Sequence, residues 1–377
     1  MSAQAWFWCS AGVVLYTYAG YPLLVAALAR LRRPAPAAEA GDAQLPEVTV
    51  VIAAYNEASR LPSKIRNLRE LDYPADRLRV LVVSDGSSDA TAEVAAGEPG
   101  VRAIGYAQRR GKAHALNRAM HEVATDFVVF CDVRQQLAPD ALRRIVARLL
   151  QPGVGVVSGE LVQRRGRTQA GRSIGLYWRY EKWIRRNESR LHSTVGATGA
   201  LYAIRREDWT PLRDGTILDD FEIPMQVVRR GRRALLEDGA QVWDGVHEDA
   251  LAERKRKIRT LSGNFQSFAG NPWLFVPWSN PVWFQFVSHK VLRLLVPYAL
   301  AACLVCSAVA SGPLMLAALL AQLAFYALAL AGSCWPPTRR SRLVGFAQVF
   351  CDMNLAAVLA LLRFLSGRID ARWEKTT

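Results

Sequence analysis

The chain has 377 residues, of which 51% are hydrophobic, and its formal net charge at pH 7 is +15. This length suits one large domain or two ordinary ones, and high apolar content combined with strong positive charge argues against a plain soluble globule. Nucleic acid is a usual partner of basic chains. However, the sequence carries no nucleic-acid recognition motif and much of its charge flanks apolar runs, so we expect no nucleic-acid partner.

The first predicted element is an apolar helix over residues 6–29. This stretch has no charged residue for 24 positions, which is enough to cross a bilayer with some tilt. No Lys or Arg precedes it and the apolar run is too long for a signal peptide, so a cleaved leader does not fit. Residues 30–33 contain three arginines, which places this end in the cytoplasm by the positive-inside rule. Residues 1–32 are therefore predicted as an N-terminal transmembrane helix, and the Pro/Ala-rich residues 33–46 as a linker.

From residue 47 onward, runs rich in β-branched residues alternate with helical patterns. The predicted strands are 47–55, 78–86, 101–105 and 127–131. The predicted helices are 62–71, 89–96, 111–123 and 139–150. Strands separated by helices predict an α/β fold with a mostly parallel sheet and right-handed crossovers. Ligands of such sheets bind at the carboxyl ends of the strands.

Polar side chains follow three strands of this predicted sheet. Residues 54–57 follow the first strand, residues 84–89 the second, and Asp132 the fourth. Each group alone is also good turn or N-cap chemistry, but three at one edge of a sheet indicate a binding site. Residues 109–112 add cations at a helix start, where backbone N–H groups and side chains suit a diphosphate. A solvated charge is the alternative for Lys112.

The segments VTVVIAAYNE, VLVVSDGSSDAT, GKAHALNRAM and VVFCD resemble, in order and spacing, the nucleotide-sugar half of family 2 glycosyltransferases. VGATGALYAIRR is similar to the acceptor-side segment of that family, and ILDDFEIPMQVVRRGRRALLED to its catalytic acidic motif. RKRKIRT, residues 254–260, lies where membrane-bound polysaccharide synthases carry a Q/R-x-x-R-W motif. The resemblance covers about residues 47–290. It implies a GT-A (nucleotide-diphospho-sugar transferase) domain with a mostly parallel sheet, joined to transmembrane helices.

The resemblance also implies a role for each matching position on the donor side. The residues implied in nucleotide-sugar binding are Ala54, Tyr55, Glu57, Asp85, Lys112, Asp132 and Arg134. Tyr55 and Glu57 would flank the base and ribose, and Asp85 would contact the base edge. Lys112 would approach the diphosphate. Asp132 would be the DxD aspartate near the ribose and a bound Mg²⁺ or Mn²⁺.

On the acceptor side, Asp220 is implied as the general base, with Asp219 as the neighbouring candidate. A sugar hydroxyl is a poor nucleophile until its proton is removed, so direct displacement with inversion needs such a base. N-capping of the helix that follows is the structural alternative for this pair. The residues implied at the acceptor or the departing diphosphate are Thr198, Gly199, Arg256 and Arg259.

Two positions depart from the family pattern. Arg134 stands where the second DxD acid is expected, so its guanidinium could contact phosphate directly, or a metal could rely on Asp132, diphosphate oxygens and water. Thr260 replaces the Trp that meets the growing polymer in processive synthases, and Arg256 replaces the Gln. Polymer handling of the cellulose type is therefore in question, whereas glycosyl transfer is not.

Residues 174–191 predict a helix with aromatic residues at near-helical spacing. We expect it to pack on the membrane-proximal side, with sugar stacking as the alternative. Its basic residues, which we expect to face anionic headgroups, are Arg179, Lys182, Arg185 and Arg186.

The C-terminal part turns aromatic and then apolar. Residues 269–290 are rich in Trp, Phe and Pro and are predicted to lie in the membrane interface, with packing against the body as the alternative. Apolar runs near 294–310, 313–331 and 344–365 predict about three transmembrane helices within residues 291–366, followed by the tail 367–377. Three crossings would leave the C-terminus outside, whereas the basic tail argues against this. The orientation of the last span stays open.

The sequence thus predicts an inverting glycosyltransferase in the inner membrane, multi-pass, with a cytoplasmic catalytic domain at residues 47–268. It would transfer a sugar from a UDP-linked or other nucleotide-diphosphate sugar to a growing exopolysaccharide. Membrane lipids and other subunits of a polysaccharide export system are further expected partners. One alternative is a single transfer onto a lipid-linked acceptor, and another is a non-catalytic subunit that binds nucleotide sugar or polymer in a secretion complex.

Overall fold

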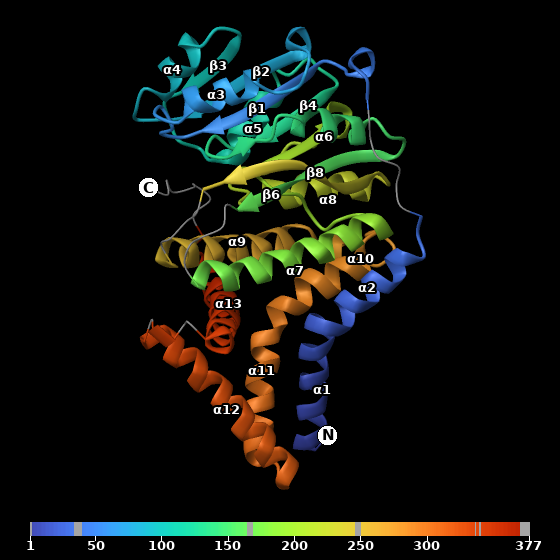
Figure 1. Ribbon diagram of the computed structural model, residues 1–377, viewed down its shortest axis with the longest axis vertical. Coiled ribbons are helices and arrows are strands. Elements are labelled where there is room, and N and C mark those ends of the chain that lie inside the picture. Colours follow the sequence, from blue (N-terminus) through green and yellow to red (C-terminus); the bar gives the residue numbers. More distant parts are fainter. Residues whose placement is uncertain are drawn as a thin grey trace.

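The computed structural model describes residues 2–33, 40–163, 169–245, 250–335, 337–338 and 341–369. Within these residues an α/β body lies on a narrower stalk of long helices (Figure 1). The body contains an eight-stranded sheet in the order β3-β2-β1-β4-β7-β6-β8-β5. Its strands are β1 (Val48–Ala54), β2 (Leu78–Asp85), β3 (Val101–Tyr106), β4 (Phe127–Cys131), β5 (Gln136–Leu137), β6 (Val154–Gln163), β7 (Leu201–Arg205) and β8 (Arg233–Asp244).

The first four strands form the parallel half of the sheet. β1 pairs in parallel with β2 and β4, and β2 pairs in parallel with β3. Successive β1 residues enter opposite cores: Val50 joins the cluster of Ile65, and Val51 joins that of Leu116. Both faces are therefore buried, which explains the continuous β-branched runs. The helices of this half are α3 (Leu61–Arg69), α4 (Thr91–Gly97) and α5 (Lys112–Met120), whereas α6 (Ala141–Leu149) packs on β6, β7 and β8.

The other half of the sheet is mixed. β7 runs antiparallel to β4 and β6, β6 and β8 are parallel, and the short β5 is antiparallel to β8. The predicted α/β fold is confirmed, and four of the seven strand pairs are parallel. Helix α8 (Asp219–Arg229) begins with the predicted acidic pair. The two halves of the sheet meet where β4 pairs with β7.

Two long helices separate the body from the stalk. α7 (Gln169–Leu191) and α9 (Ala250–Gly270) lie beneath the sheet in Figure 1. α7 packs on the N-terminal helix, where Ile184 is buried with Tyr21 and Val25. The aromatic helix thus packs on a candidate membrane span, and its membrane-proximal position stays a prediction.

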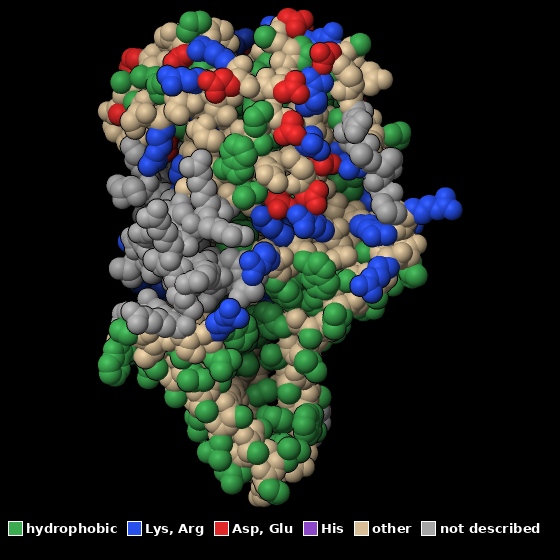
Figure 2. All heavy atoms as spheres, viewed as in Figure 1, with side chains coloured by type: hydrophobic (Ala, Val, Ile, Leu, Met, Phe, Trp, Pro, Cys, Tyr) green, Lys and Arg blue, Asp and Glu red, His purple; other side chains and the backbone are tan. Residues whose placement is uncertain are grey.

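Four helices of the described chain are long and apolar enough to cross a membrane. The first, residues 3–30, comprises α1 (Ala3–Leu15), a π-helical turn and α2 (Tyr21–Arg30); the second runs from Trp283 to Val309 and contains α10 (Trp283–Gln285), another π-helical turn and α11 (Leu292–Val309). The third and fourth are α12 (Pro313–Cys334) and α13 (Arg342–Leu365). Figure 2 shows the stalk almost free of charged side chains, as expected for a lipid-facing surface.

The predicted interfacial segment is shorter than expected. Residues 271–282 contain a 3₁₀ turn, Pro272–Phe275, and the strongly exposed Trp278. The long helix then begins at Trp283, eight residues before the predicted boundary at 291. The sequence missed this start because the aromatic residues before the long apolar run were read as a separate segment.

Helix α13 packs against the base of the body. Its Ala360 is buried beside Ile258 of α9, and its Phe364 ring stacks on Phe265 of α9 with centroids 6.1 Å apart. Beyond the helix, Ile369 packs against the hydrophobic core of the body. The end of the described chain therefore lies on the same side as the body.

Candidate functional site

The loops that follow β1 and β2 are joined by hydrogen bonds. Asn56, with a positive φ of 54°, accepts from Ser88 N at 2.8 Å through its Oδ1, and its Nδ2 donates to Ser88 Oγ at 3.0 Å. Glu57 N donates to Thr91 Oγ1 at 2.8 Å. The predicted nucleotide-side residues of the first loop are thus held by the second loop.

Asp85 is fully buried at the end of β2, and its carboxylate holds the loop that precedes α5. Its Oδ1 accepts from Tyr106 Oη and Arg110 N, both at 2.8 Å, and its Oδ2 accepts from Gly111 N at 2.9 Å. Gly111 has a φ of 97°, a conformation that favours glycine. Three donors already occupy this carboxylate, so the structure gives Asp85 a loop-holding position, and its predicted contact with a base edge stays a prediction.

The same loop lies against the first strand end. The Arg109 guanidinium is 3.7 Å from the centroid of the Tyr55 ring, a cation–π contact, and the buried Ala54 ends β1 just before it. A Cβ on Gly86 would lie 2.4 Å from Arg109 N, so only glycine allows the two loops to approach this closely. The predicted nucleotide-side residues Ala54, Tyr55 and Glu57 thus share one edge of the sheet.

Lys112 lies between two carboxylates at the centre of the site. Its Nζ is 3.2 Å from Asp132 Oδ1 and 3.2 Å from Asp219 Oδ2. Burial opposes the ammonium charge, but Asp132, Asp219 and Asp220 outweigh burial and raise the pKa of Lys112. Tyr202 Oη donates to Asp219 Oδ2 at 3.0 Å, a contact that the sequence did not predict. The end of β4 and the first turns of α5 and α8 therefore converge on one charged cluster.

Asp220 faces the acceptor-side loop. A Cβ on Gly199 would lie 3.1 Å from Asp220 Oδ2, and Ala197 N donates to the backbone oxygen of Asp220 at 2.6 Å. Burial and then the Asp219 charge raise the pKa of Asp220 to about 6, against the opposing charges of Lys112 and Lys290. No described residue donates a hydrogen bond to this carboxylate. A carboxylate of this kind is suited to accept a proton near neutral pH.

The N-capping alternative for the acidic pair is not what the structure shows. Leu218 occupies the N-cap position of α8, without a side-chain capping bond, and both aspartates lie in the first turn. There they gain only from the helix dipole. Their side chains have different neighbours. Asp219 is engaged by Lys112 and Tyr202, whereas Asp220 lies next to Gly199.

Arg134 is directed to a buried acid. Its Nη2 is 2.6 Å from Asp244 Oδ2 at the end of β8, and Gln135 Nε2 donates to the same oxygen at 3.3 Å. Arg134 therefore makes an ion pair in this structure, and its contact with phosphate stays a prediction. Asp244 was missed, although an acid at a strand end was an available signal.

The side chains at this edge of the sheet can be compared with the ligands that the expected Mg²⁺ or Mn²⁺ needs. No group of three or more His, Cys, Asp or Glu that could hold a metal occurs among the described residues. Asp132 offers a carboxylate whose side chain is 39% exposed. Mg²⁺ is commonly held by one or two carboxylates together with substrate phosphates and water. The residues therefore fit a metal held mainly by a diphosphate, with Asp132 as its protein ligand.

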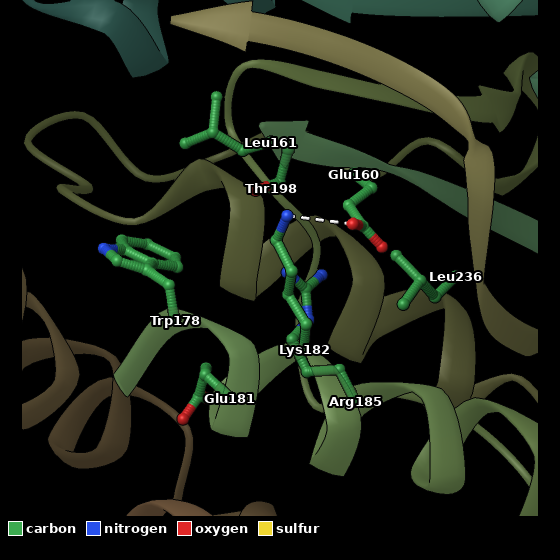
Figure 3. A pocket seen from close by; sticks show the side chains of 8 residues that line it. All are labelled: Glu160, Leu161, Trp178, Glu181, Lys182, Arg185, Thr198 and Leu236. Atoms are coloured by element: carbon green, nitrogen blue, oxygen red, sulfur yellow. Dashed lines mark hydrogen bonds and ion pairs between the residues drawn. The ribbon is translucent and has the colours of Figure 1, made fainter. Parts of the chain in front are cut away.

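A small pocket opens between α7 and the sheet (Figure 3). It is lined by Glu160, Leu161, Trp178, Glu181, Lys182, Arg185, Thr198 and Leu236. Ser158 Oγ accepts from Thr198 N at 2.9 Å and from Arg185 Nη2 at 3.0 Å. A Cβ on Gly199 would meet Asp220, so the structure brings the predicted Thr198 and Gly199 close to the predicted base. It also adds Arg185, which the sequence placed at lipid headgroups.

Arg256 and Arg259 lie on α9, half-buried. Further along this helix, Gly263 packs against Ile217 and Leu218, immediately before the acidic pair. α9 thus supports the segment that carries Asp219. A role of the two arginines at the acceptor or diphosphate stays a prediction.

Residues 49–209 match the family model described as Glycosyl transferase family 2. An N-acetylglucosaminyltransferase of Bradyrhizobium elkanii is 32% identical over 124 residues, 31% of this chain and 68% of that protein. A beta-monoglucosyldiacylglycerol synthase of Synechocystis is 26% identical over 253 residues, 62% of this chain and 52% of that protein. A poly-beta-1,6-N-acetyl-D-glucosamine synthase of Staphylococcus aureus is 23% identical over 232 residues, covering 59% and 56%. The chain spans about a third to a half of the length of the first curated relatives that it matches.

Among solved structures, the mannosyltransferase PcManGT from Pyrobaculum calidifontis, in complex with GDP-Man and Mn²⁺, is similar over body and stalk. The TM-score is 0.71 with 25% sequence identity, and the match covers 96% of this chain and 99% of that one.

Proposed function

The chain belongs to glycosyl transferase family 2, and from this premise we propose that it transfers a sugar, with inversion, from a nucleotide-diphosphate sugar to an acceptor at the membrane. The observation that carries the proposal is Asp220. Its carboxylate has a pKa raised to about 6, interacts electrostatically with Lys112 and Asp132, and lies close to Gly199, the neighbour of the pocket residue Thr198. A base in this position can reach an acceptor hydroxyl while the donor lies at the strand ends.

The proposed reaction is a direct displacement. Asp220 takes the proton of the acceptor hydroxyl, and the resulting oxygen forms a bond to the anomeric carbon from the face opposite the diphosphate. The bond between that carbon and the phosphate oxygen breaks, and the nucleoside diphosphate leaves with the electron pair. Lys112 offers positive charge where the diphosphate departs. A divalent cation held by Asp132 would supply further neutralisation of the leaving group.

The nucleotide of the donor sugar has two candidates. The sequence favours a UDP-linked sugar, whereas the structural relative that aligns with nearly the whole chain was solved with GDP-Man and Mn²⁺. A panel of UDP- and GDP-sugars, with and without Mg²⁺ or Mn²⁺, tests both. Release of nucleoside diphosphate from one of them by the purified protein in vesicles would support transfer. Binding without turnover for every sugar would instead favour the non-catalytic subunit.

As the acceptor we propose a lipid-anchored molecule that receives a single sugar. We favour this acceptor over the growing exopolysaccharide. The pocket between α7 and the sheet is small, and Glu160 in its lining makes ion pairs to Lys182 at 2.8 Å and Arg186 at 2.9 Å. Thr260 also stands where a polymer-contacting Trp is expected. The polymer remains a second candidate because a poly-beta-1,6-N-acetyl-D-glucosamine synthase is among the relatives. Mass spectrometry of the lipid fraction separates one added sugar from a ladder of products.

We also propose the membrane arrangement that this acceptor requires. The body lies on the cytoplasmic face of the inner membrane, because arginines follow α2 at the body side. Residues 3–30, residues 283–309 and α12 cross the bilayer. α13 does not cross but packs against α9, since Ile369 beyond it packs on the body.

A further inference from the structure

The loop that follows β4 carries the carboxylate that would hold the metal. Residues 132–135 connect β4 to the short β5, and Asp132 is the acid of this loop. Its partly exposed side chain lies 3.2 Å from Lys112 Nζ at the centre of the site. Arg134, where a second acid is expected, is ion-paired with Asp244. The fit of a metal therefore depends on where this one loop places Asp132.

Two side chains of α3 hold this loop from inside the body. Lys64 Nζ donates to the backbone oxygen of Gln135 at 2.9 Å. Asn67 Oδ1 accepts from Leu137 N at 2.8 Å, and Asn67 Nδ2 donates to the backbone oxygen of Leu137 at 3.0 Å. Lys64 and Asn67 lie three residues apart, on one face of the helix. The main chain just beyond Asp132 is thus fixed at two points by one helix.

Lys64 is an unusual residue for this place, because it is fully buried. Burial lowers its pKa, and the nearby Cys131 and Asp132 oppose that shift. An amine and an ammonium both donate hydrogen bonds, so the bond to Gln135 does not depend on the charge of Lys64. Removing an amino group from water costs free energy, whereas a methionine fills a similar volume without that cost. A hydrogen bond to the loop is what a lysine supplies here and a methionine cannot.

We propose that Lys64 and Asn67 are positioning residues for Asp132, which keep its carboxylate where a metal–diphosphate can bind. Lys64 is fully buried, so it acts on the donor through the loop and not by touching the donor. Mg²⁺ tolerates little departure from octahedral geometry, and a site with one protein carboxylate has no second acid to compensate for a shift of the first. This inference rests on the proposed function and identifies the residues that support its metal ligand.

The test measures Mn²⁺ binding by the purified full chain in detergent, in the presence of UDP or GDP. Electron paramagnetic resonance quantifies the free Mn²⁺, so the Kd is obtained without turnover. The variants are Lys64→Met, which removes the donor at similar length, and Asn67→Ala, which frees the far end of the loop. Asp132→Asn shows the effect of losing the ligand itself. The matched control is Thr49→Val, which removes another buried hydrogen bond, 2.8 Å long to Thr125, near the opposite end of β4.

We expect the Kd of Mn²⁺ to rise about ten-fold or more in Lys64→Met and in Asn67→Ala, because residues that support a metal ligand commonly contribute that much to metal affinity. In Thr49→Val it should stay within about two-fold of the unaltered value. With saturating donor, the KM for Mn²⁺ should rise by the same factor as the Kd, whereas kcat at saturating Mn²⁺ should change much less. A merely structural role would lower the active fraction, and so kcat, without changing the KM for Mn²⁺.

An unchanged Kd of Mn²⁺ in both variants would overturn the positioning. The Tm of each variant shows whether it folds, and if Lys64→Met does not, an unchanged Kd in Asn67→Ala is sufficient to overturn it. Absence of Mn²⁺ binding by the unaltered chain with either diphosphate would also overturn it, whatever the turnover.

Donor turnover separates this inference from the proposed function. Nucleoside diphosphate release by the unaltered chain, with the same Kd of Mn²⁺ in the variants, would reject the positioning alone. Mn²⁺ binding that both variants weaken, without turnover of any donor, would reject the transferase alone.

Discussion

At the scale of single residues, the acidic pair shows how one environment gives two neighbouring carboxylates different chemistry. Asp219 is engaged by Lys112 and Tyr202, whereas Asp220 has no described donor and a pKa raised to about 6 by burial and by the Asp219 charge. Pairs of titratable groups whose surroundings shift their pKa values apart are a common basis for assigning the acid and the base of a reaction. The sequence left the choice between these residues open, and the contacts favour Asp220.

The pH dependence of transfer follows from this assignment. A general base works in its deprotonated form, so kcat should fall about ten-fold per pH unit below an apparent pKa near 6 and level off above it. The apparent value belongs to the coupled aspartates rather than to one alone. Initial rates between pH 4.5 and 8 with saturating donor give the profile, and a flat rate from pH 7 to 5 would argue against Asp220 as the base.

Arg134 gives a prediction about stability. The ion pair with the buried Asp244 means that Arg134→Ala leaves a carboxylate with one cation fewer in the interior, at a cost of about 2 to 4 kcal/mol. We expect a lower Tm in detergent, while Arg60→Ala, which breaks a partly exposed pair with Glu57, should change the Tm little. An unchanged Tm in Arg134→Ala would show that the ion pair contributes nothing to stability.

Residue-level roles were the least predictable part of the site. Strand period and turn chemistry are local, so the sequence placed Asp85 and Asp132 at strand ends and Lys112 at a helix start. Asp220 was implied only by the resemblance to the family. The sequence could not show that Asp85 holds a loop or that Arg134 faces Asp244, since the residues of each pair come from distant segments. Long-range partners leave no local signal.

At the scale of elements, the loop before β7 positions the base. Gly196 has a φ of 98°, and Gly199 lies close to Asp220. Parallel strands with crossover helices were predictable from continuous apolar runs, whereas the antiparallel insertion of β7 between β4 and β6 was not. The pairing order of strands depends on contacts between segments that pattern alone does not specify.

Gly199→Ala tests the loop. The added methyl group would lie 3.1 Å from Asp220 Oδ2, so the carboxylate must move by a few tenths of an ångström. We expect kcat to fall about ten-fold or more while the donor KM stays within about two-fold, because small misplacement of a catalytic group is costly. The control is Gly97→Ala, where a Cβ would meet nothing within 4 Å. Equal kcat in the two variants would contradict the positioning.

At the scale of the whole molecule, the body and the stalk are joined by two helices that also border the site. α7 carries the acceptor-side Arg185 and also packs on α2, and α9 supports the acidic pair and also packs on α13. The number of apolar helices could be counted from the sequence. The position of α13 could not, because a helix that lies under the body has the same length and composition as one that crosses.

The membrane arrangement predicts the location of the C-terminal region. If α13 does not cross, Ser366→Cys should react with a membrane-impermeant maleimide only from the cytoplasmic side of inside-out vesicles, in a background without the native cysteines. Labelling from the periplasmic side of intact spheroplasts would mean that α13 crosses. A cysteine in the loop at Ser311 is the matched control, since that loop lies at the far end of the stalk and should label from the outside.

The most direct test of the account is the turnover of a nucleotide sugar by Asp220→Asn in lipid vesicles. We predict that the rate of sugar transfer by Asp220→Asn falls by at least about a thousand-fold. Asp219→Asn and the unaltered chain should both keep donor binding. Because the folded-state pKa of Asp220 lies above its unfolded value, its charge costs stability above pH 6, and the Tm of Asp220→Asn at pH 7.5 should not fall. A folded Asp220→Asn protein that transfers sugar at the unaltered rate would contradict the assignment of the base, and with it the proposed mechanism.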